Sequence, residues 1–326
     1  MATAEQIKAL IKSYIEEDDA RFCAVAMQVA AHAARQGHGR LADELRTLVD
    51  EAKSSAGTKC RKGPVPIATP RGELSELLAA SYPQAKLADM VLTDALLRRV
   101  TRILREYRQQ HKLHAHGLSP RRKFLLMGPP GSGKTMTASA LSGELKLPLF
   151  VIQLDGLITK FMGETAAKLR LIFGAMEQTA GIYLFDEFDA IGSERAIPND
   201  VGEMRRILTS FLQLLDQDRS NSLIVATTNH GEVLDRALFR RFDDVIEYQH
   251  PTRDLAQTMF KNSLAAFDTT DVDWKCILDA AGGLSYADLV RACEDAAKES
   301  ILSGTVVVTT GRLLSALEER RSVVHR

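Results

Sequence analysis

The chain carries at residues 128–135 the stretch that decides its fold, Gly128-Pro129-Pro130-Gly131-Ser132-Gly133-Lys134-Thr135. The apolar run at residues 123–127 before it predicts a buried strand, and the residues from Met136 onward predict a helix. Glycines allow several backbone N–H groups to converge on phosphate oxygens at a helix N-terminus. The form G-x-x-x-x-G-K-T therefore predicts a nucleotide site that extends from Gly128 to Met136. In it the Lys134 ammonium reaches the β- and γ-phosphates and the Thr135 hydroxyl ligates Mg²⁺.

Strands and helices alternate along the chain after this loop. Apolar runs at residues 148–152, 182–185, 223–227 and 245–248 predict four further strands, with helical periodicity between them. Such alternation predicts an α/β fold with a five-stranded, mostly parallel sheet sandwiched by helices. After Pro251 the pattern is helical throughout, which predicts a separate lid.

Length and composition narrow the class of protein. The 326 residues exceed the usual size of one domain. Lys plus Arg and Asp plus Glu both number 42, so the net charge is zero. The overall charge therefore does not indicate binding to nucleic acid or to a membrane surface. Four widely spaced cysteines form no C-x-x-C pair, and we find neither a signal peptide nor an apolar run of about 18 residues. We expect a cytoplasmic protein.

Four regions are expected along the chain. Helical periodicity at residues 1–54 predicts a small N-terminal bundle, either a docking module for a client or partner or a packing extension of the main domain. Glycines and prolines at residues 55–72 predict a semi-rigid linker. The nucleotide-binding subdomain is expected at residues 73–250, and the helical lid at residues 251–326.

Two helices are predicted before the phosphate-binding strand. The first lies around residues 74–78. In the second, at residues 94–110, an apolar face is formed by Leu97, Val100, Leu104 and Tyr107. The other faces of this helix carry Arg98, Arg99, Arg102, Arg105 and Arg108. These arginines could contact nucleic acid, but a solvated face or a contact with a neighbouring subunit is the commoner use of such a pattern.

Polar residues follow two of the predicted strands. Asp186 and Glu187 end the strand at residues 182–185, and Asn229 follows the strand at residues 223–227. Nucleotide chemistry in open α/β sheets takes place at the carboxyl ends of the strands. We predict that Asp186 holds Mg²⁺ through water and that Glu187 orients and deprotonates the attacking water. Asn229 can sense the γ-phosphate, although asparagine at a strand end is ordinarily a turn residue.

Two adjacent arginines, Arg240 and Arg241, follow an apolar anchor in the segment at residues 234–243. Such a pair suits an arginine finger, which stabilises charge on the γ-phosphate. The alternative is a pair of surface salt bridges that contribute little.

The order of these motifs resembles that of the AAA ATPases, and within them the katanin and spastin group. The lid stretch at residues 283–289 is similar to the family's G-x-S-G-A-D-[IL] pattern. The resemblance implies ATP and Mg²⁺ as cofactors and a homo-oligomeric ring, usually a hexamer, in which Arg240 and Arg241 act on the neighbour's nucleotide. Because Ala287 stands where other branches place a sensing arginine, we expect no such arginine in the lid.

The family also points to a pore loop after the second strand. Phe161 and Met162 match its aromatic and apolar positions, which can grip a polypeptide through non-directional apolar contacts. The alternative places Phe161 in the core at the start of a helix.

The leading functional hypothesis is a Mg-ATP-hydrolysing ring that remodels, unfolds or threads a polypeptide client. By resemblance alone, the chain could instead be the ATPase of a two-gene module with a separate subtilisin-like protease, in toxin–antitoxin or anti-phage systems. It has neither H-E-x-x-H nor G-x-S-x-G of its own. From other classes, it could be an ATP-dependent regulatory switch or a nucleic-acid remodeller. The neutral net charge argues against the last.

Overall fold

The structure is a computed structural model, which describes residues 72–157, 162–189, 201–234 and 236–324, together with Val29, Thr47 and Pro70. The chain divides into two units, Met1–Ile67 and Ala68–Arg326, and only the second is described in detail. The predicted N-terminal bundle and linker therefore lie almost wholly outside the described residues.

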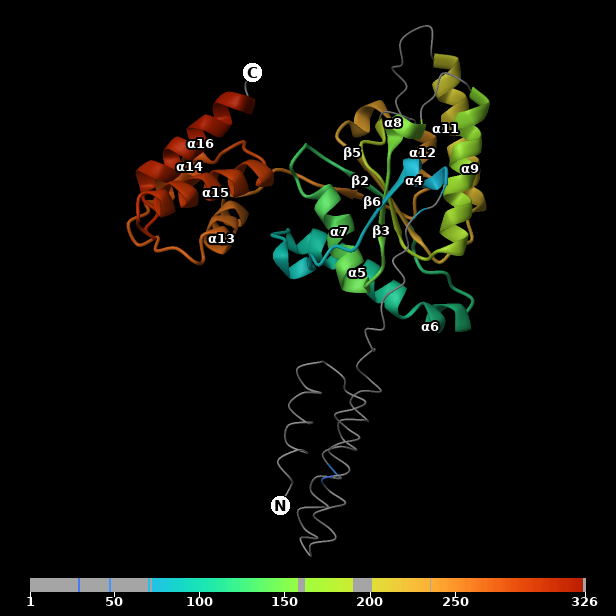
Figure 1. The fold of residues 1–326 in the computed structure, drawn as a ribbon, viewed down its shortest axis with the longest axis horizontal. Coiled ribbons are helices and arrows are strands. Elements are labelled where there is room, and N and C mark those ends of the chain that lie inside the picture. The colour runs from blue at the N-terminus through green and yellow to red at the C-terminus, as the bar shows by residue number, and fades with distance from the viewer. Residues whose placement is uncertain are drawn as a thin grey trace, which may run out of the picture. The chain divides into compact units, whose positions relative to one another are not determined.

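A six-stranded sheet forms the centre of the second unit (Figure 1). In the order of their hydrogen bonding, the strands are β1 (Leu78–Ser81), β3 (Leu149–Ile152), β4 (Ile182–Phe185), β5 (Leu223–Thr228), β2 (Lys123–Met127) and β6 (Asp244–Glu247). β1 is antiparallel to β3, and all other neighbours are parallel. The predicted α/β fold with a mostly parallel sheet is confirmed, and β2 to β6 match the five predicted strands to within one residue at each end.

The predicted number of strands was too low by one, because β1 was missed; it begins at Leu78, the last residue of the helix predicted around residues 74–78. The helix there, α4 (Leu74–Leu77), is a single turn. Leu78 then pairs with Ile152, and Ser81 pairs with Leu149. Without β1, the outer edge of β3 would leave backbone N–H and C=O groups unpaired. Tertiary pairing therefore overrides the local helical pattern.

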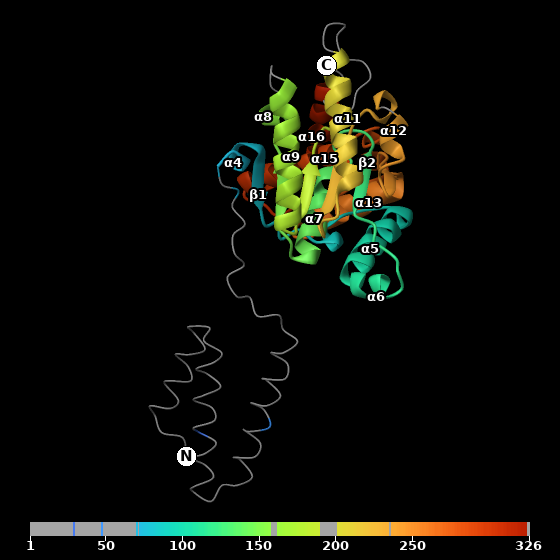
Figure 2. The same ribbon diagram turned by 90° about the vertical axis from the view of Figure 1, so that its right-hand side faces the viewer.

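Helices cover both faces of the sheet (Figures 1 and 2). One layer contains α5 (Asp94–Arg108) and α7 (Lys134–Leu145), and the other contains α9 (Met162–Gln178) and α11 (Val201–Gln217). Neighbouring residues of a strand point to opposite faces. Leu126 accordingly packs in the core beneath α5 and α7, and Leu125 in the core beneath α9 and α11. The second core includes four phenylalanine rings with centroids 4.7 to 6.4 Å apart, those of Phe173, Phe185, Phe188 and Phe211.

The predicted helix at residues 94–110 is α5, which ends at Arg108, and a short helix that was not predicted, α6 (Gln110–Ala115), follows it. The assignment of Leu97 to the apolar face of α5 was wrong, because Leu97 is 41% exposed. The buried stripe runs through Val100, Ile103 and Leu104 instead. Of the arginines, Arg99 bonds to the Asp244 carboxylate and to the Val245 carbonyl, and Arg108 pairs with Glu144 at 2.8 Å. Part of the basic face thus attaches α5 to the sheet and to α7.

The lid consists of α13 (Arg253–Ser263), α14 (Trp274–Ala280), α15 (Tyr286–Leu302) and α16 (Thr310–Val324), which lie where the periodicity of the sequence predicted helices. It has an apolar core of its own, which includes Phe260, Leu289 and Leu313. The remaining short elements are η1 (Leu87–Asp89), α8 (Leu154–Leu157), η2 (Gly231–Val233) and α12 (Arg236–Phe239). Among the described residues, none of these helices has the length and apolar character needed to cross a bilayer.

Candidate active site

The phosphate-binding loop joins β2 to α7 through backbone conformations that require glycine. Gly128, Gly131 and Gly133 have φ angles of 145°, 68° and 98°. Space is also limiting, since a Cβ at Gly128 would lie 2.3 Å from the Tyr248 carbonyl oxygen. These constraints fix the loop at the N-terminus of α7, where unpaired N–H groups and the helix dipole favour an anion.

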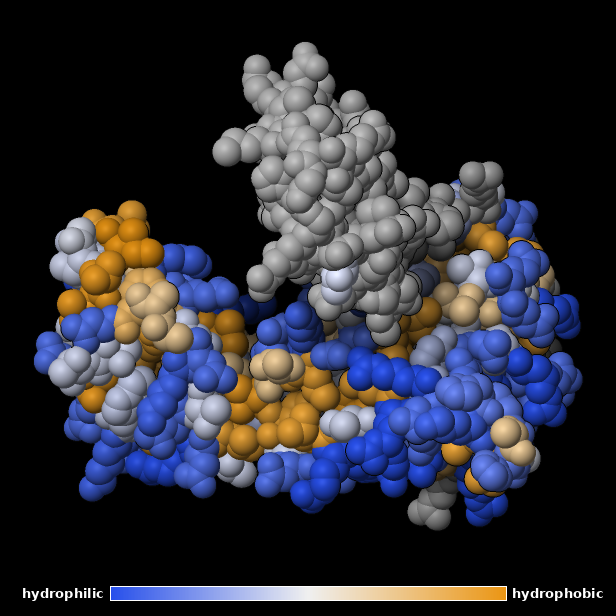
Figure 3. Space-filling model, turned by 90° about the horizontal axis from the view of Figure 1, so that it is seen from below, coloured by the Kyte–Doolittle hydropathy of each residue, from blue (hydrophilic) through white to orange (hydrophobic). Residues whose placement is uncertain are grey.

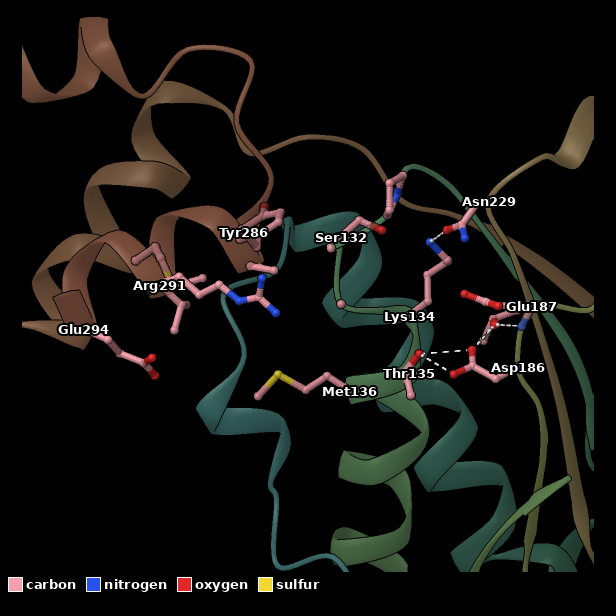
Figure 4. A pocket seen from close by; sticks show the side chains of 17 residues that line it. Ser132, Lys134, Thr135, Met136, Asp186, Glu187, Asn229, Tyr286, Arg291 and Glu294 are labelled. Atoms are coloured by element: carbon pink, nitrogen blue, oxygen red, sulfur yellow. Dashed lines mark hydrogen bonds between the residues drawn. The ribbon is translucent and has the colours of Figure 1, made fainter. Parts of the chain in front are cut away.

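The strand order brings the other polar residues to the same edge of the sheet. β5 lies between β2 and β4, so Asn229 after β5 lies between the loop and the Asp186-Glu187 pair after β4 (Figure 4). The Lys134 ammonium donates to Asn229 Oδ1 and to the carbonyl oxygens of Gly128 and Pro129, each at 2.8 Å. Lys134 is only 7% exposed, and desolvation lowers its pKa.

Oxygen atoms suited to a hard cation gather beside Lys134. The Thr135 hydroxyl donates to the two Asp186 carboxylate oxygens at 3.1 and 3.2 Å, and the Thr227 hydroxyl also donates to Asp186. Mg²⁺ prefers such oxygens, completed by water and phosphate. Among the described residues, no group of three or more His, Cys, Asp or Glu side chains could hold a metal ion by itself. The residues present therefore fit a Mg²⁺ that is held jointly with a phosphate chain.

Glu187 occupies a backbone conformation that is unusual for its residue type. Its φ is 52°, in the left-handed region, which persists only where the surroundings enforce it. Its N–H donates to Thr227 Oγ1 at 3.1 Å, and the N–H of the fully buried Phe188 donates to the Thr227 carbonyl at 2.8 Å. This turn keeps the exposed Glu187 carboxylate beside Asp186 in the cavity.

One buried polar atom of the loop lacks a partner. The Ser132 hydroxyl belongs to a residue that is 3% exposed and has no hydrogen bond within the described structure. A buried hydroxyl group without a hydrogen-bond partner lowers the stability of the fold. A phosphate oxygen in the loop would supply the missing acceptor, so the loop fits an anionic ligand.

A cavity of about 530 Å³ opens in front of these residues. We call the residues that line it from the sheet side the body wall; they are Pro130, Gly131, Ser132, Gly133, Lys134, Thr135, Met136, Asp186, Glu187, Thr227 and Asn229. The lid wall consists of Met259, Tyr286, Ala287, Val290, Arg291 and Glu294. A second cavity of about 680 Å³ shares six lining residues with the first, namely Ser132, Gly133, Met136, Met259, Tyr286 and Val290. It is mostly apolar, and Figure 3 shows apolar surface on this face of the body next to the lid.

Some residues singled out in the sequence do not line the cavity. Gly128 and Pro129 contribute carbonyl oxygens to Lys134 instead. Arg240 is exposed after α12, and Arg241 pairs with Asp216 at 3.2 Å, so the chain does not bring either arginine to its own cavity. Phe161 and the side chain of Met162 lie outside the described residues.

Two cavity residues were missed in the sequence. Thr227, which bonds to Asp186 and to the Glu187 N–H, was assigned only to a strand. The second is Arg291, which lines the cavity from the lid and was not considered in the sequence, where only the position of Ala287 was weighed for a sensing arginine. Residues four apart share a helix face. The spacing of one helical turn between Ala287 and Arg291 could therefore have pointed to Arg291 from the sequence.

Comparison with known proteins shows the family to which the chain belongs. Residues 124–250 match the ATPase family associated with various cellular activities (AAA). Over 306 residues the chain is 32% identical to y4kL, an uncharacterized AAA family ATPase of Sinorhizobium fredii, covering 93% of this chain and 90% of that protein. The chain belongs to the AAA family of ATPases. The resemblance stated above is confirmed for the family, and membership of the katanin and spastin group stays a prediction.

Other relatives are longer than this AAA ATPase. It is 32% identical over 225 residues to the proteasome-activating nucleotidase of Aeropyrum pernix, which covers 66% of this chain and 55% of that protein. It is 30% identical over 253 residues to the ATP-dependent zinc metalloprotease FtsH 1 of Methylacidiphilum infernorum, covering 75% of this chain and 40% of that protein. The chain thus spans about half the length of these two relatives, or less.

Proposed function

We propose that this AAA ATPase forms a ring that uses Mg²⁺ and ATP to remodel polypeptides. The observation that supports the proposal is the convergence of Lys134, Thr135, Asp186, Glu187 and Asn229 on one cavity from three strand ends. Phosphoryl transfer to water depends mostly on positioning and charge neutralisation, and these side chains offer both.

The two adjoining cavities suit the two ends of ATP. In this proposal the phosphates lie along the loop at residues 130–135, and the purine occupies the larger apolar cavity beside Met90, Met136 and Met259. Methionine thioethers are polarizable and make favourable contacts with aromatic rings.

The body wall supplies the groups that hydrolysis requires. Thr135 and Asp186 would hold Mg²⁺, Asp186 partly through water. When bound, the ion neutralises charge on the phosphate oxygens. The Glu187 carboxylate orients a water molecule and accepts its proton. Asn229 and Lys134, which are hydrogen-bonded to each other, place a donor amide and an ammonium beside the γ-phosphate.

A second subunit would complete the site. Arg240 and Arg241 do not line the cavity of their own chain. In the proposed homo-oligomer, which we expect to be a hexamer, they act on the neighbour's γ-phosphate, where an arginine can contribute about 10³ to 10⁵ in rate.

The names of two relatives support a polypeptide client. One relative is a proteasome-activating nucleotidase and the other an ATP-dependent zinc metalloprotease, so each name joins nucleotide use to protein degradation. We propose that Phe161 and Met162 grip the client. The same names favour a second candidate function, in which this ATPase serves a separately encoded protease.

The function is tested by measuring the ATPase rate per subunit against protein concentration, with and without an unfolded polypeptide, for the wild type, Phe161→Ala and Phe161→Tyr. We expect the rate to rise with concentration and the polypeptide to stimulate the wild type and Phe161→Tyr. In Phe161→Ala the ratio of stimulated to basal rate should fall toward one. A rate that neither concentration nor polypeptide changes would contradict threading and leave an ATP-dependent switch.

A further inference from the structure

The arginines in the described part of the lid fall into two groups. Arg253, Arg312, Arg320 and Arg321 each donate to an oxygen atom of the lid itself. Arg291 has no hydrogen bond or ion pair among the described residues, and it lines the nucleotide cavity. A guanidinium carries five donors in a planar fork that matches carboxylate and phosphate oxygens. Arg291 is therefore the lid arginine that is available to a ligand.

The acidic neighbours of Arg291 on α15 leave it available. Side chains three and four residues apart meet on a helix. Asp288 instead accepts from the Ser285 N–H at 3.1 Å and from its hydroxyl at 2.6 Å. Asp295 accepts from Arg320 and from Lys298. Glu294 lines the same cavity, and Figure 4 shows its carboxylate apart from the Arg291 guanidinium.

The Arg291 side chain extends into the cavity. Figure 4 shows its guanidinium directed from α15 toward the phosphate-binding loop. On the body wall, the Lys134 ammonium already has three oxygen partners, and the carboxylates of Asp186 and Glu187 are negative. A polyphosphate entering this cavity meets a cation on the lid wall only at Arg291. Charge-assisted hydrogen bonds to phosphate are among the stronger ones in proteins.

The start of α15 is tied to the same loop. The Ala287 N–H donates to the Gly131 carbonyl at 3.1 Å, and a Cβ at Gly131 would lie 2.4 Å from Ser285 Oγ. Arg291 lies one turn further along the face that carries Ala287. The helix that presents the guanidinium is thus held at its beginning by the loop that would hold the phosphates.

We propose that Arg291 contacts the phosphate chain of the bound nucleotide and thereby joins the lid to the nucleotide. The inference rests on the nucleotide site proposed above and adds a binding residue to it. The lid then contributes to affinity through a side chain as well as through the apolar surface around Met259 and Val290.

The test measures the Kd of ADP with Mg²⁺ for the full chain in the wild type, Arg291→Ala, Arg291→Lys and Lys298→Ala. Lys298 is the matched control, because it lies on the same helix, carries the same charge and does not line the cavity. Arg291→Ala should raise the Kd about tenfold or more, as expected for a lost hydrogen bond to a charged group. Arg291→Lys should keep part of the affinity, and Lys298→Ala should stay within about twofold of the wild type.

Two further measurements are needed. One distinguishes a phosphate contact of Arg291 from a packing role, and the other distinguishes failure of the Arg291 inference from failure of the proposed nucleotide site. Loss of a phosphate contact should reduce the dependence of the Kd on KCl concentration in Arg291→Ala, which a packing role would not do. Lys134→Ala reports on the site itself. If Lys134→Ala abolishes ADP binding while Arg291→Ala matches the wild type in Kd and salt dependence, only the role of Arg291 is overturned. If Lys134→Ala binds ADP normally, the nucleotide site and the inference both fail.

Discussion

The two walls of the cavity differ in how their polar groups are satisfied. On the body wall, the Lys134 ammonium has three oxygen partners, and the Asp186 carboxylate accepts from two hydroxyl groups. On the lid wall, Arg291 has no hydrogen-bond or ion-pair partner in the described part of the chain. The hydrogen bonds around Lys134 and Asp186 are therefore formed without a ligand, whereas the partners of Arg291 would have to come from a ligand.

This difference assigns different tasks to the two walls. Catalytic groups gain from preorganisation, because they need not be reoriented as charge develops. A binding residue gains from having no internal partner, since no existing contact is lost when it meets a ligand. We therefore expect the rate to depend mostly on the body wall, and the contribution of the lid to nucleotide affinity to depend on Arg291.

Lys134→Met removes a charged group of the body wall, and we expect it to have the largest effect on ATPase rate and nucleotide binding. The variant removes the ammonium at the centre of the hydrogen-bonded network, so the ATPase rate should fall about 10²-fold or more and nucleotide binding should be lost. Equilibrium binding and steady-state hydrolysis measure the two effects.

Lys123→Met is the matched control for this variant. Lys123 is also a partly buried lysine whose pKa is lowered by desolvation, and it donates to the Leu215 carbonyl outside the cavity. The Lys123→Met variant should have a lower free energy of unfolding than the wild type but should still bind the nucleotide. Equal loss of binding in both variants would mean that Lys134 acts through the fold.

Tyr248→Phe should have a smaller effect, on stability and not on nucleotide binding. The Tyr248 hydroxyl pairs with Thr137 Oγ1 of α7 at 2.7 Å, away from the cavity, and burial raises the pKa of Tyr248 to about 12. Removal of this hydrogen bond should lower the free energy of unfolding by about 1 kcal/mol. The Kd of ADP should change less than in Arg291→Ala.

The same variant has a predicted pH dependence. Because the folded state raises the Tyr248 pKa above its ordinary value of 10.0, the neutral phenol stabilises the fold below about pH 10, and this stabilisation is lost as the pH rises toward about 12. Tyr248→Phe should show a smaller loss of stability between pH 9 and pH 11, as measured by urea unfolding (about one pKa unit on either side of 10). An unchanged alkaline loss would contradict this role for Tyr248.

More of the cavity residues on the body wall than on the lid wall could be predicted from the sequence, and the reason is physical. The phosphate-binding loop is one continuous stretch, and Asp186 and Asn229 are marked by the apolar strands that precede them. Parallel strand ends meet at one edge, so grouping these residues requires only the fold class. Arg291 reaches the cavity only because α15 packs against Gly131, a contact between distant parts of the chain.

Two errors in the predicted fold have similar origins. The strand character of β1 comes from its pairing with the edge of β3 and not from its own residues. Leu97 has helical spacing from Val100 and Leu104, but the core contacts the stripe one position away, through Leu96. Neither outcome follows from local periodicity alone.

We propose that Glu187 activates the water that hydrolyses ATP, while the rest of the body wall holds the nucleotide. The most direct measurement follows ATP binding and ATP turnover together in Glu187→Gln, with Glu294→Gln as a control that neutralises a carboxylate on the lid wall. We predict that Glu187→Gln binds ATP with a Kd within about threefold of the wild type while kcat falls about 10²- to 10⁴-fold, and that Glu294→Gln keeps its turnover. Turnover near the wild-type rate in Glu187→Gln would rule out this role for the Glu187 carboxylate.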